Sequence, residues 1–202
     1  MLTDAEIAKF WSAASAERAE FGALVKLLLL TGCRLNEVAG MTSGELSDDR
    51  MTWSIPGART KNGRPHLVPL APLAQQILGN VRETDTAAGQ SYIFSTTDGI
   101  SHVSGWSKIK ARMDDRMKIP HWRLHDLRRT AATGMAEIGI APHIVEAALN
   151  HISGAKAGVA GVYNRAQYSA EKKAALARWA QHVSGVIDGG VANVVPLGNR
   201  RR

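Results

Sequence analysis

Cysteine is nearly absent from this sequence. The single cysteine, Cys33, excludes an internal disulfide and any zinc site built from cysteines, and it reads as a small buried residue rather than a nucleophile. Long hydrophobic runs are absent as well, because the longest covers residues 27–30, against the roughly 20 residues that span a bilayer. No basic stretch followed by an apolar one opens the chain, so no secretory signal peptide is expected. We therefore expect a cytoplasmic protein.

The chain has enough apolar residues for a core and an excess of positive charge. Its 202 residues are 45% hydrophobic, which is sufficient for one well-buried domain. The formal net charge is +7, which favours an acidic partner, with nucleic acid first and an anionic membrane surface second. A basic protein without such a partner is the alternative that charge alone leaves open.

Helical signals dominate the first third of the chain. Thr3 followed by Glu6 is a capping box that predicts a helix to about Ala14. A second helix is expected over residues 16–30, ending at Thr31-Gly32. A short third helix would then carry Arg34 and Glu37 one turn apart on one face.

The middle of the chain carries strand and turn signals. Residues 51–55 and 66–70 contain β-formers and flank Pro56-Gly57 and Asn62-Gly63, which predicts a small antiparallel sheet with Lys61 beside the hairpin turn. Residues 72–81 are expected to be helical and residues 84–91 to form a polar loop. Residues 91–95 are a candidate third strand of the sheet.

The remainder of the chain is helical again, and the whole reads as one domain. Helices are expected over residues 104–117, 124–138, 142–149 and 169–183, the last capped by Ser169, with a glycine-rich loop or weak helix at 153–161. The fold class is mainly α with a small antiparallel β-sheet (α+β). We assign residues 1–185 to this domain and residues 186–202 to a flexible basic tail.

Basic side chains recur in five local contexts with a late tyrosine. They are Thr31-Gly32-Cys33-Arg34-Leu35-Asn36-Glu37, Thr60-Lys61-Asn62-Gly63-Arg64, His125-Asp126-Leu127-Arg128-Arg129-Thr130, Leu149-Asn150-His151 and Gly161-Val162-Tyr163-Asn164-Arg165. Arginine can bind two phosphate oxygens at once, tyrosine can attack phosphorus, and lysine or histidine can protonate a leaving alkoxide. Singly, each has a plain alternative: an ion pair, a solvated turn, a helix cap or a packing residue. Together they predict a phosphate-binding site.

In this order and spacing, the boxes resemble those of the tyrosine recombinases, the family that includes temperate-phage and genomic-island integrases. The resemblance runs from about residue 2 to residue 181 and covers the catalytic domain of that family. It implies site-specific cleavage and rejoining of double-stranded DNA through a 3′-phosphotyrosyl link, without cofactor or metal. It also implies further protomers that assemble on DNA into a tetrameric synapse.

The resemblance also implies a role for each residue. Arg34 and Arg128 would bind the non-bridging oxygens of the scissile phosphate, and His125 and His151 would donate to the same phosphate. Tyr163 would be the nucleophile, Lys61 would protonate the departing 5′ oxygen, and the supporting Glu37 would orient Arg34. Unperturbed tyrosine has a pKa of about 10, so the nucleophile needs cationic neighbours or a base.

Some positions depart from the family pattern. Asn150 stands where a glycine usually precedes the third basic residue, and the segment between His151 and Tyr163 is long, which leaves Tyr168 as an alternative nucleophile. Arg64 is an alternative phosphate contact beside Lys61. The sequence also starts where the catalytic domain is expected to start, without the helical domain that usually precedes it. A type IB topoisomerase-like activity and a non-catalytic DNA-binding remnant remain the alternative functions.

Overall fold

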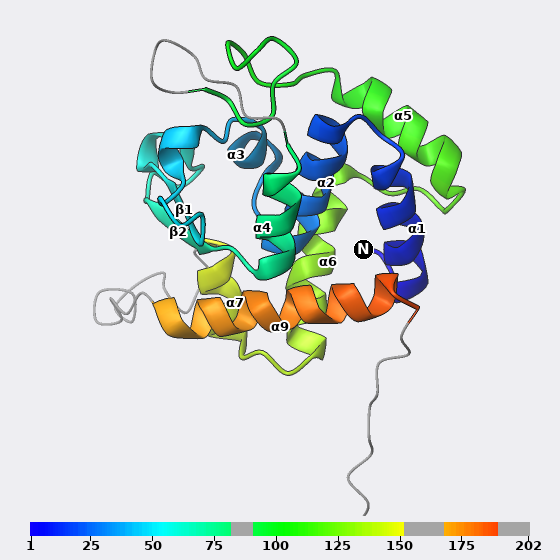
Figure 1. Cartoon of the computed structure of the whole chain (residues 1–202). Helices are drawn as coiled ribbons and strands as arrows, with labels where there is room; N and C mark the ends of the chain where they lie inside the picture. Colours follow the sequence, from blue (N-terminus) through cyan, green and yellow to red (C-terminus); the bar gives the residue numbers. More distant parts are fainter. Residues whose placement is uncertain (82–90, 152–167, 190–202) are drawn as a thin grey trace, which may run out of the picture.

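The computed structural model describes residues 1–81, 91–151 and 168–189. Helices surround the buried helix α2 (Ala19–Thr31), against which α1 (Asp4–Ser15), α4 (Pro72–Gly79) and α6 (Leu124–Glu137) pack. The long helix α9 (Ser169–Ile187) crosses one end of these helices, from the small sheet to α1 (Figure 1). The helix α5 (Trp106–Met117) covers the outer side of α1. The predicted class, mainly helical with a small antiparallel sheet, is confirmed.

The first helix begins and the second ends at the signals that the sequence predicted. Thr3 accepts the backbone N–H of Glu6 and Glu6 accepts the backbone N–H of Thr3, so the predicted capping box opens α1. The second helix ends at Gly32, whose φ of +63° places it in the left-handed region. A Cβ atom there would lie 2.3 Å from Leu149 Cδ2, so glycine also permits close packing against the end of α7 (Pro142–Ala148). The short helix α3 (Leu35–Ala39) follows at once.

The sheet is a hairpin of β1 (Thr52–Ile55) and β2 (His66–Pro69), as predicted. The strands are antiparallel, with Thr52 opposite Pro69 and Ile55 opposite His66. The 3-10 helices η1 (Ser43–Glu45) and η2 (Gly57–Arg59) lie before β1 and in the loop between the strands.

The prediction that residues 91–95 add a third strand is wrong for the described part of the sheet. The Ile93 N–H donates to the Met41 carbonyl oxygen at 2.9 Å, and Tyr92 forms an isolated bridge with Thr42. This segment therefore pairs with the connection after α3 instead of extending the hairpin.

The start of the last helix also differs from the prediction. The cap position of α9 is held by Tyr168, at a φ of +47°, and Ser169 is the first helical residue. The helix continues to Ile187, four residues beyond the expected end. The predicted loop at 153–161 and residues 190–202 of the predicted tail lie outside the described residues.

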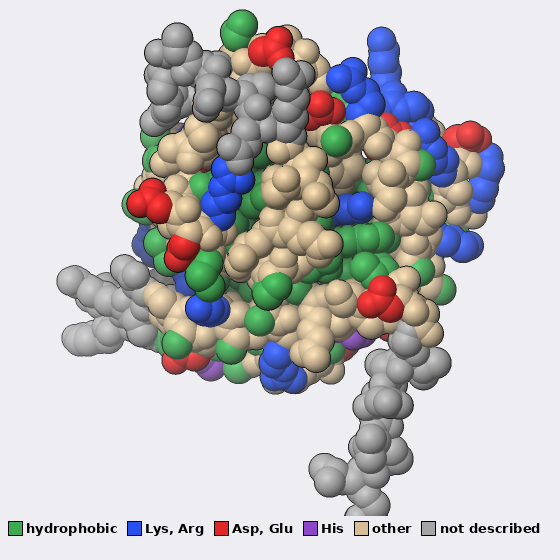
Figure 2. Space-filling view, viewed as in Figure 1, with side chains coloured by type: hydrophobic (Ala, Val, Ile, Leu, Met, Phe, Trp, Pro, Cys, Tyr) green, Lys and Arg blue, Asp and Glu red, His purple; other side chains and the backbone are tan. Residues whose placement is uncertain are grey.

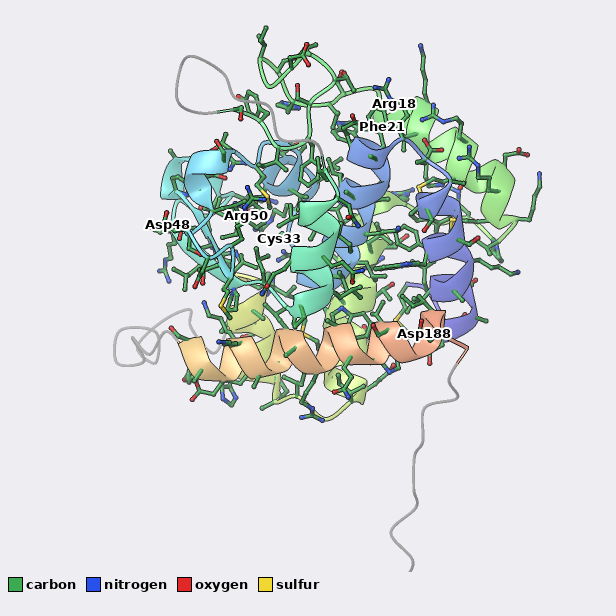
Figure 3. All side chains as sticks on the ribbon, viewed as in Figure 1. Arg18, Phe21, Cys33, Asp48, Arg50 and Asp188 are labelled. Atoms are coloured by element: carbon green, nitrogen blue, oxygen red, sulfur yellow. The ribbon has the colours of Figure 1, made fainter. Side chains whose placement is uncertain are left out.

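Large apolar side chains fill the interior. Phe10, Trp53, Phe94 and Trp179 are almost completely buried, and the indole N–H of Trp179 donates to the Leu29 carbonyl oxygen at 2.9 Å. Cys33 lies in this interior (Figure 3), where burial raises the pKa of its thiol to about 12. Its expected role as a buried, unreactive residue fits this environment. Among the described helices, none combines the length and the apolar character needed to cross a membrane.

Candidate active site

Arg34 stands at the N-terminal end of α3 and is fixed by Glu37 one turn later. The guanidinium donates to Glu37 Oε1 at 3.0 Å, while the Arg34 backbone N–H donates to Oε2 at 2.8 Å. The Glu37 side chain is only 3% exposed, whereas the Arg34 side chain is 22% exposed. The buried carboxylate therefore holds the arginine from the interior and leaves part of the guanidinium accessible. Arg34 and Glu37 lie together, as predicted, and this ion pair is consistent with the expectation that Glu37 orients Arg34.

Arg128 is buried within α6 and is held by backbone oxygens instead of a carboxylate. Its NH1 donates to the Gly32 carbonyl oxygen at 2.7 Å, and its NH2 donates to the Leu149 carbonyl oxygen at 2.9 Å. Neither partner neutralises its charge. Burial lowers the pKa of Arg128, and the positive charge of Arg34 lowers it further. The turn after α2 and the end of α7 are thus tied to one guanidinium.

His125 lies in the first turn of α6, one turn before Arg128, and its side chain is accessible. Partial burial lowers its pKa, and the charges of Arg128 and Arg129 act in the same direction, so the neutral imidazole is favoured. The charge of Arg34 also lowers the pKa of His125, so both predicted arginines act on this imidazole. In the cluster of Arg34, His125 and Arg128, the positive charge thus resides on the two arginines.

Lys61 occupies an exposed turn in the loop between β1 and β2, as predicted. The base of this loop is anchored by Arg59, which the sequence analysis did not single out. Arg59 NH2 donates to the Glu37 carbonyl oxygen at 2.7 Å, and its NH1 forms an ion pair with the buried Glu45. The carboxylate of Glu45 also accepts the indole N–H of Trp53 at 3.0 Å. The lysine loop is thus joined to the helix that presents Arg34.

The tip of the lysine loop is joined to the residue before His151. Asn62 Nδ2 donates to the Asn150 carbonyl oxygen at 3.0 Å and to Asn150 Oδ1 at 3.2 Å. Asn150 Nδ2 donates back to Asn62 Oδ1 at 3.3 Å and to the Arg64 carbonyl oxygen at 3.3 Å. Lys61 precedes one member of this pair and the exposed His151 follows the other. Sequence reasoning missed the pair because its members lie 88 positions apart.

His66 in β2 is a further buried group beside the cluster. Its side chain is 4% exposed, and among the described residues neither ring nitrogen makes a well-formed hydrogen bond. Burial lowers the pKa of His66 to about 3, with the charges of Lys172 and Arg128 acting in the same direction, although the nearby backbone of Ala148 acts to raise it. The ring is therefore neutral at physiological pH. Lys172, from α9, donates to the Leu67 carbonyl oxygen at 2.9 Å and so holds β2 from the other side.

Five of the six predicted catalytic residues are described, and short contacts join Arg128 to the turns that carry Arg34, Lys61 and His151, while His125 lies one turn before Arg128 on α6. Arg128 links the turn before Arg34 to the residue before Asn150, and the asparagine pair continues this path to Lys61. Tyr163, the predicted nucleophile, lies outside the described residues. The alternative, Tyr168, is half-buried at the cap of α9, and its ring lies edge-on to that of His143 with centroids 5.3 Å apart.

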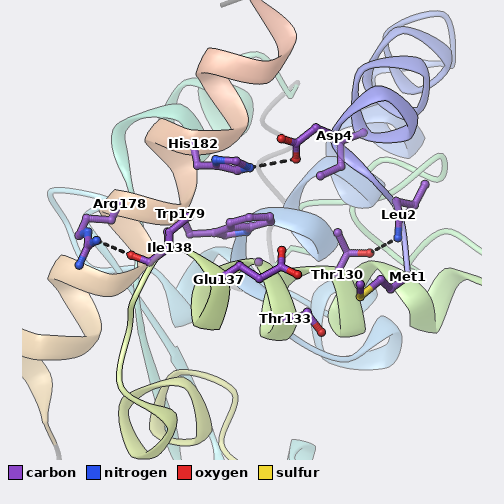
Figure 4. A pocket seen from close by; sticks show the side chains of 12 residues that line it. Met1, Leu2, Asp4, Thr130, Thr133, Glu137, Ile138, Arg178, Trp179 and His182 are labelled. Carbon is purple, nitrogen blue, oxygen red and sulfur yellow. Dashed lines mark hydrogen bonds and ion pairs between the residues drawn. The ribbon is translucent and has the colours of Figure 1, made fainter. Parts of the chain in front are cut away.

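Other features of the described surface lie apart from this cluster. A hollow of about 580 Å³ opens between α1, α6 and α9 (Figure 4), and its lining residues include none of the predicted catalytic side chains. Lys and Arg side chains also gather over α5 (Figure 2), where Arg112 and Arg116 both pair with the buried carboxylate of Glu17. In the part of the chain that the structure describes, no three histidine, cysteine or acidic side chains are grouped as metal ligands.

The model of the phage integrase family matches residues 1–169, which is most of the chain and includes every predicted site residue. The chain belongs to the phage integrase family. Among its relatives in that family is prophage integrase IntA of Escherichia coli (strain K12), which is 29% identical over 163 residues, covering 81% of this chain and 38% of IntA. Prophage integrase IntZ of the same strain is 27% identical over 188 residues, covering 91% of this chain and 45% of IntZ. The chain thus spans less than half the length of these relatives.

The fold is that of integrase-family enzymes of known structure. The XerH site-specific recombinase, solved in a pre-cleavage complex with its difH substrate, superposes with a TM-score of 0.61 at 20% sequence identity, covering 75% of this chain and 47% of XerH. A λ integrase dimer bound to a core site gives a TM-score of 0.58 at 19% identity, covering 75% of this chain and 57% of that one. At these identities the likeness establishes the fold of this integrase-family chain.

Proposed function

We propose that this chain is the catalytic part of a site-specific DNA recombinase that integrates or excises a mobile element. Tyr163 attacks the scissile phosphate and forms a 3′-phosphotyrosyl link, and Lys61 protonates the departing 5′ oxygen. Strand exchange reverses the step with a second 5′ hydroxyl, so the phosphodiester energy is kept in the tyrosyl ester. Residues 1–185 form the catalytic domain together with the end of α9, which runs to Ile187 and so moves the start of the tail beyond the expected residue 186. The protein acts on DNA in the cytoplasm.

The observation that carries this proposal is the cluster of Arg34, Arg128 and His125. The charge of Arg34 lowers the pKa of the Arg128 guanidinium, and the hydrogen-bond partners of Arg128 among the described residues are two uncharged carbonyl oxygens. Such a cluster is stabilised when an anion enters it. A phosphate in the phosphorane-like transition state carries more negative charge than in the ground state, so fixed cations lower the barrier.

The wider roles follow from the family. Family members crystallised with DNA include XerH and a λ integrase dimer. By analogy, this chain binds double-stranded DNA and assembles with further protomers into a tetrameric synapse. A type IB topoisomerase-like activity is the second candidate, because it requires the same chemistry without a defined target.

Covalent trapping tests the proposal. In a nicked half-site from the element's attachment region, cleavage releases a short fragment that carries the free 5′ hydroxyl. Because this fragment diffuses away, the strand cannot be rejoined and the protein stays linked to DNA. We expect an adduct whose DNA-linked peptide maps to Tyr163 and which Tyr163→Phe abolishes. A linkage at Tyr168 would refute the assignment of the nucleophile, and complete absence of an adduct would favour the DNA-binding remnant. Relaxation of plasmids that lack the site would favour the topoisomerase.

A further inference from the structure

We propose that the side-chain amides of Asn62 and Asn150 form a positioning bridge that places Lys61 for proton transfer to the leaving group. The inference rests on the proposed function, because it assigns Lys61 a part in that reaction. It adds two residues that act on the reaction through the lysine turn.

The bridge is suited to this task because it closes the open end of the lysine loop. Arg59 anchors the base of the loop to Glu37 and Glu45, but Lys61 lies beyond that anchor, on an exposed turn. The next residue, Asn62, makes two hydrogen bonds to Asn150, at 3.0 and 3.2 Å. Lys61 is therefore held between a charged anchor on one side and a paired amide on the other.

Asn62 also shapes the turn itself. Its Oδ1 accepts the Arg64 backbone N–H at 3.1 Å and the Thr60 hydroxyl at 3.2 Å, while its Nδ2 faces Asn150. The acceptor side of the amide therefore orders the loop and accepts Asn150 Nδ2 at 3.3 Å, while the donor side makes the two shorter bonds to Asn150, just after α7. An aspartate would keep only the acceptor function, and a serine would be too short for both.

The bridge explains why an asparagine, and not the usual glycine, precedes His151. Asn150 has a φ of +49°, a backbone conformation that glycine and asparagine adopt more readily than other residues. Glycine would satisfy the backbone equally well but could not reach Asn62. The asparagine thus supplies both the backbone conformation and the side-chain contact to the lysine loop.

The activity test compares Asn150→Gly, Asn62→Ala and the double variant on two half-sites. One substrate has the natural bridging 5′ oxygen, and the other has sulfur there, which leaves without protonation. On the natural substrate each single variant should cleave about 10- to 100-fold more slowly, the scale for a misplaced catalytic group. The double variant should be no slower than the slower single one. On the sulfur substrate all three should return to within about threefold of the parent, as Lys61→Ala should too.

A matched control and a second measurement separate the bridge from the rest of the fold. Asn80→Ala changes an exposed asparagine at the end of α4 and should leave both rates unchanged. Hydrogen exchange of the free protein reports on the bridge without DNA: Asn150→Gly should accelerate exchange of the backbone amides of residues 60–64 about tenfold, while leaving α2 unchanged.

The outcomes are distinct. Unchanged rates, an equal loss on both substrates, additive losses in the double variant, or unchanged exchange at residues 60–64 would each overturn the bridge. If the parent forms no adduct, the proposed function fails, and faster exchange at residues 60–64 would still support the contact between the two asparagines. An active parent with unaffected variants would refute the bridge alone.

Discussion

Arg128 is held by two backbone carbonyl oxygens, one two residues before Arg34 and one two residues before His151. This residue therefore has two functions: it presents positive charge, and it joins two turns that carry other members of the site. A side chain with one cationic nitrogen cannot satisfy both oxygens in the same planar geometry. A lysine at position 128 would keep the positive charge but would lose one of these two hydrogen bonds.

Arg128→Lys tests this dual role. We expect cleavage to fall at least ~100-fold, because donors aimed at the transition state are lost. The free energy of unfolding should fall by about 1–3 kcal/mol, because a buried carbonyl oxygen loses its partner. Urea denaturation and covalent trapping measure the two effects. The control is Arg129→Lys, whose side chain is 69% exposed and pairs with Asp126, and which should change neither by much. Equal behaviour of the two variants would contradict the argument.

His66 gives a residue-scale prediction of pH dependence. Its pKa is about 3 in the folded protein and near 6.5 when unfolded, so below pH 6.5 the unfolded chain binds a proton that the folded chain does not. Stability should therefore be complete above about pH 7 and fall as the pH decreases towards 3, by up to about 1.4 kcal/mol per pH unit from this group.

His66→Leu should remove that part of the acid sensitivity. Urea denaturation of parent and variant at pH 7.5, 6, 5 and 4 should give free energies that diverge as the pH falls, with the parent losing more. Parallel curves would show that the buried imidazole is solvated in the folded protein. The acidic residues contribute their own acid dependence to both proteins, so only the difference between the curves reports on His66.

At the scale of elements, helices α6 and α9 pack closely at Gly134. A Cβ atom at Gly134 would lie 2.3 Å from Trp179 Cζ3, and the indole N–H of Trp179 is bound to Leu29 in α2. The indole therefore cannot move aside without losing that hydrogen bond. Helix α6, which carries His125 and Arg128, is thus fixed at a set distance from α9.

Gly134→Ala should destabilise the protein by about 1–3 kcal/mol, because an added methyl group overpacks a filled site. Gly185→Ala is the matched control, since that glycine is also helical and has open space around its Cβ position. It should stabilise the protein by up to about 1 kcal/mol, through the better helix propensity of alanine. Thermal unfolding followed by circular dichroism measures both. Opposite signs are expected, and a stabilising Gly134→Ala would refute the packing argument.

The sequence predicted elements better than it predicted contacts. The Thr3 capping box and the hairpin turns are local signals, so α1, β1 and β2 could be predicted from nearby residues. The third strand was wrong because backbone pairing of residues 91–95 with Met41 and Thr42 depends on distant parts of the chain. Arg34, Lys61, His125, Arg128 and His151 were singled out from their boxes, and their catalytic roles stay predictions. Arg59, Asn62 and Asn150 were missed because their importance lies in side-chain contacts that no local pattern encodes.

At the scale of the whole molecule, the basic side chains behind the net charge of +7 differ in how far they are already neutralised by ion pairs. Glu17 is nearly buried and pairs with both Arg112 and Arg116, which reduces the charge that α5 offers to a partner. Among the residues that the structure describes, Arg34 pairs with Glu37, whereas Arg128 forms no ion pair. DNA binding is therefore expected to depend on a limited number of phosphate contacts.

Salt titration tests this expectation. Binding of the chain to duplex DNA should weaken steeply as salt increases, with a logarithmic slope of about −3 or steeper, because each neutralised phosphate releases a counterion. Arg34→Ala should make the slope shallower by roughly one unit, and Arg112→Ala by less. Fluorescence anisotropy between 50 and 300 mM salt, about the range where screening acts strongly, gives these slopes. A flat titration would show that phosphate contacts do not govern binding.

The first residues of the chain are fastened directly to the helix that carries the site. The Leu2 backbone N–H donates to the Thr130 hydroxyl at 2.8 Å, and Thr130 lies two residues after Arg128 (Figure 4). A tether pulled from the N-terminus would therefore load α6 before it loads the sheet, so mechanical tension would reach Arg128 first. In a single-molecule force experiment, a handle attached at Met1 should disturb catalysis at lower force than one attached at the exposed tip of the loop around Ile100.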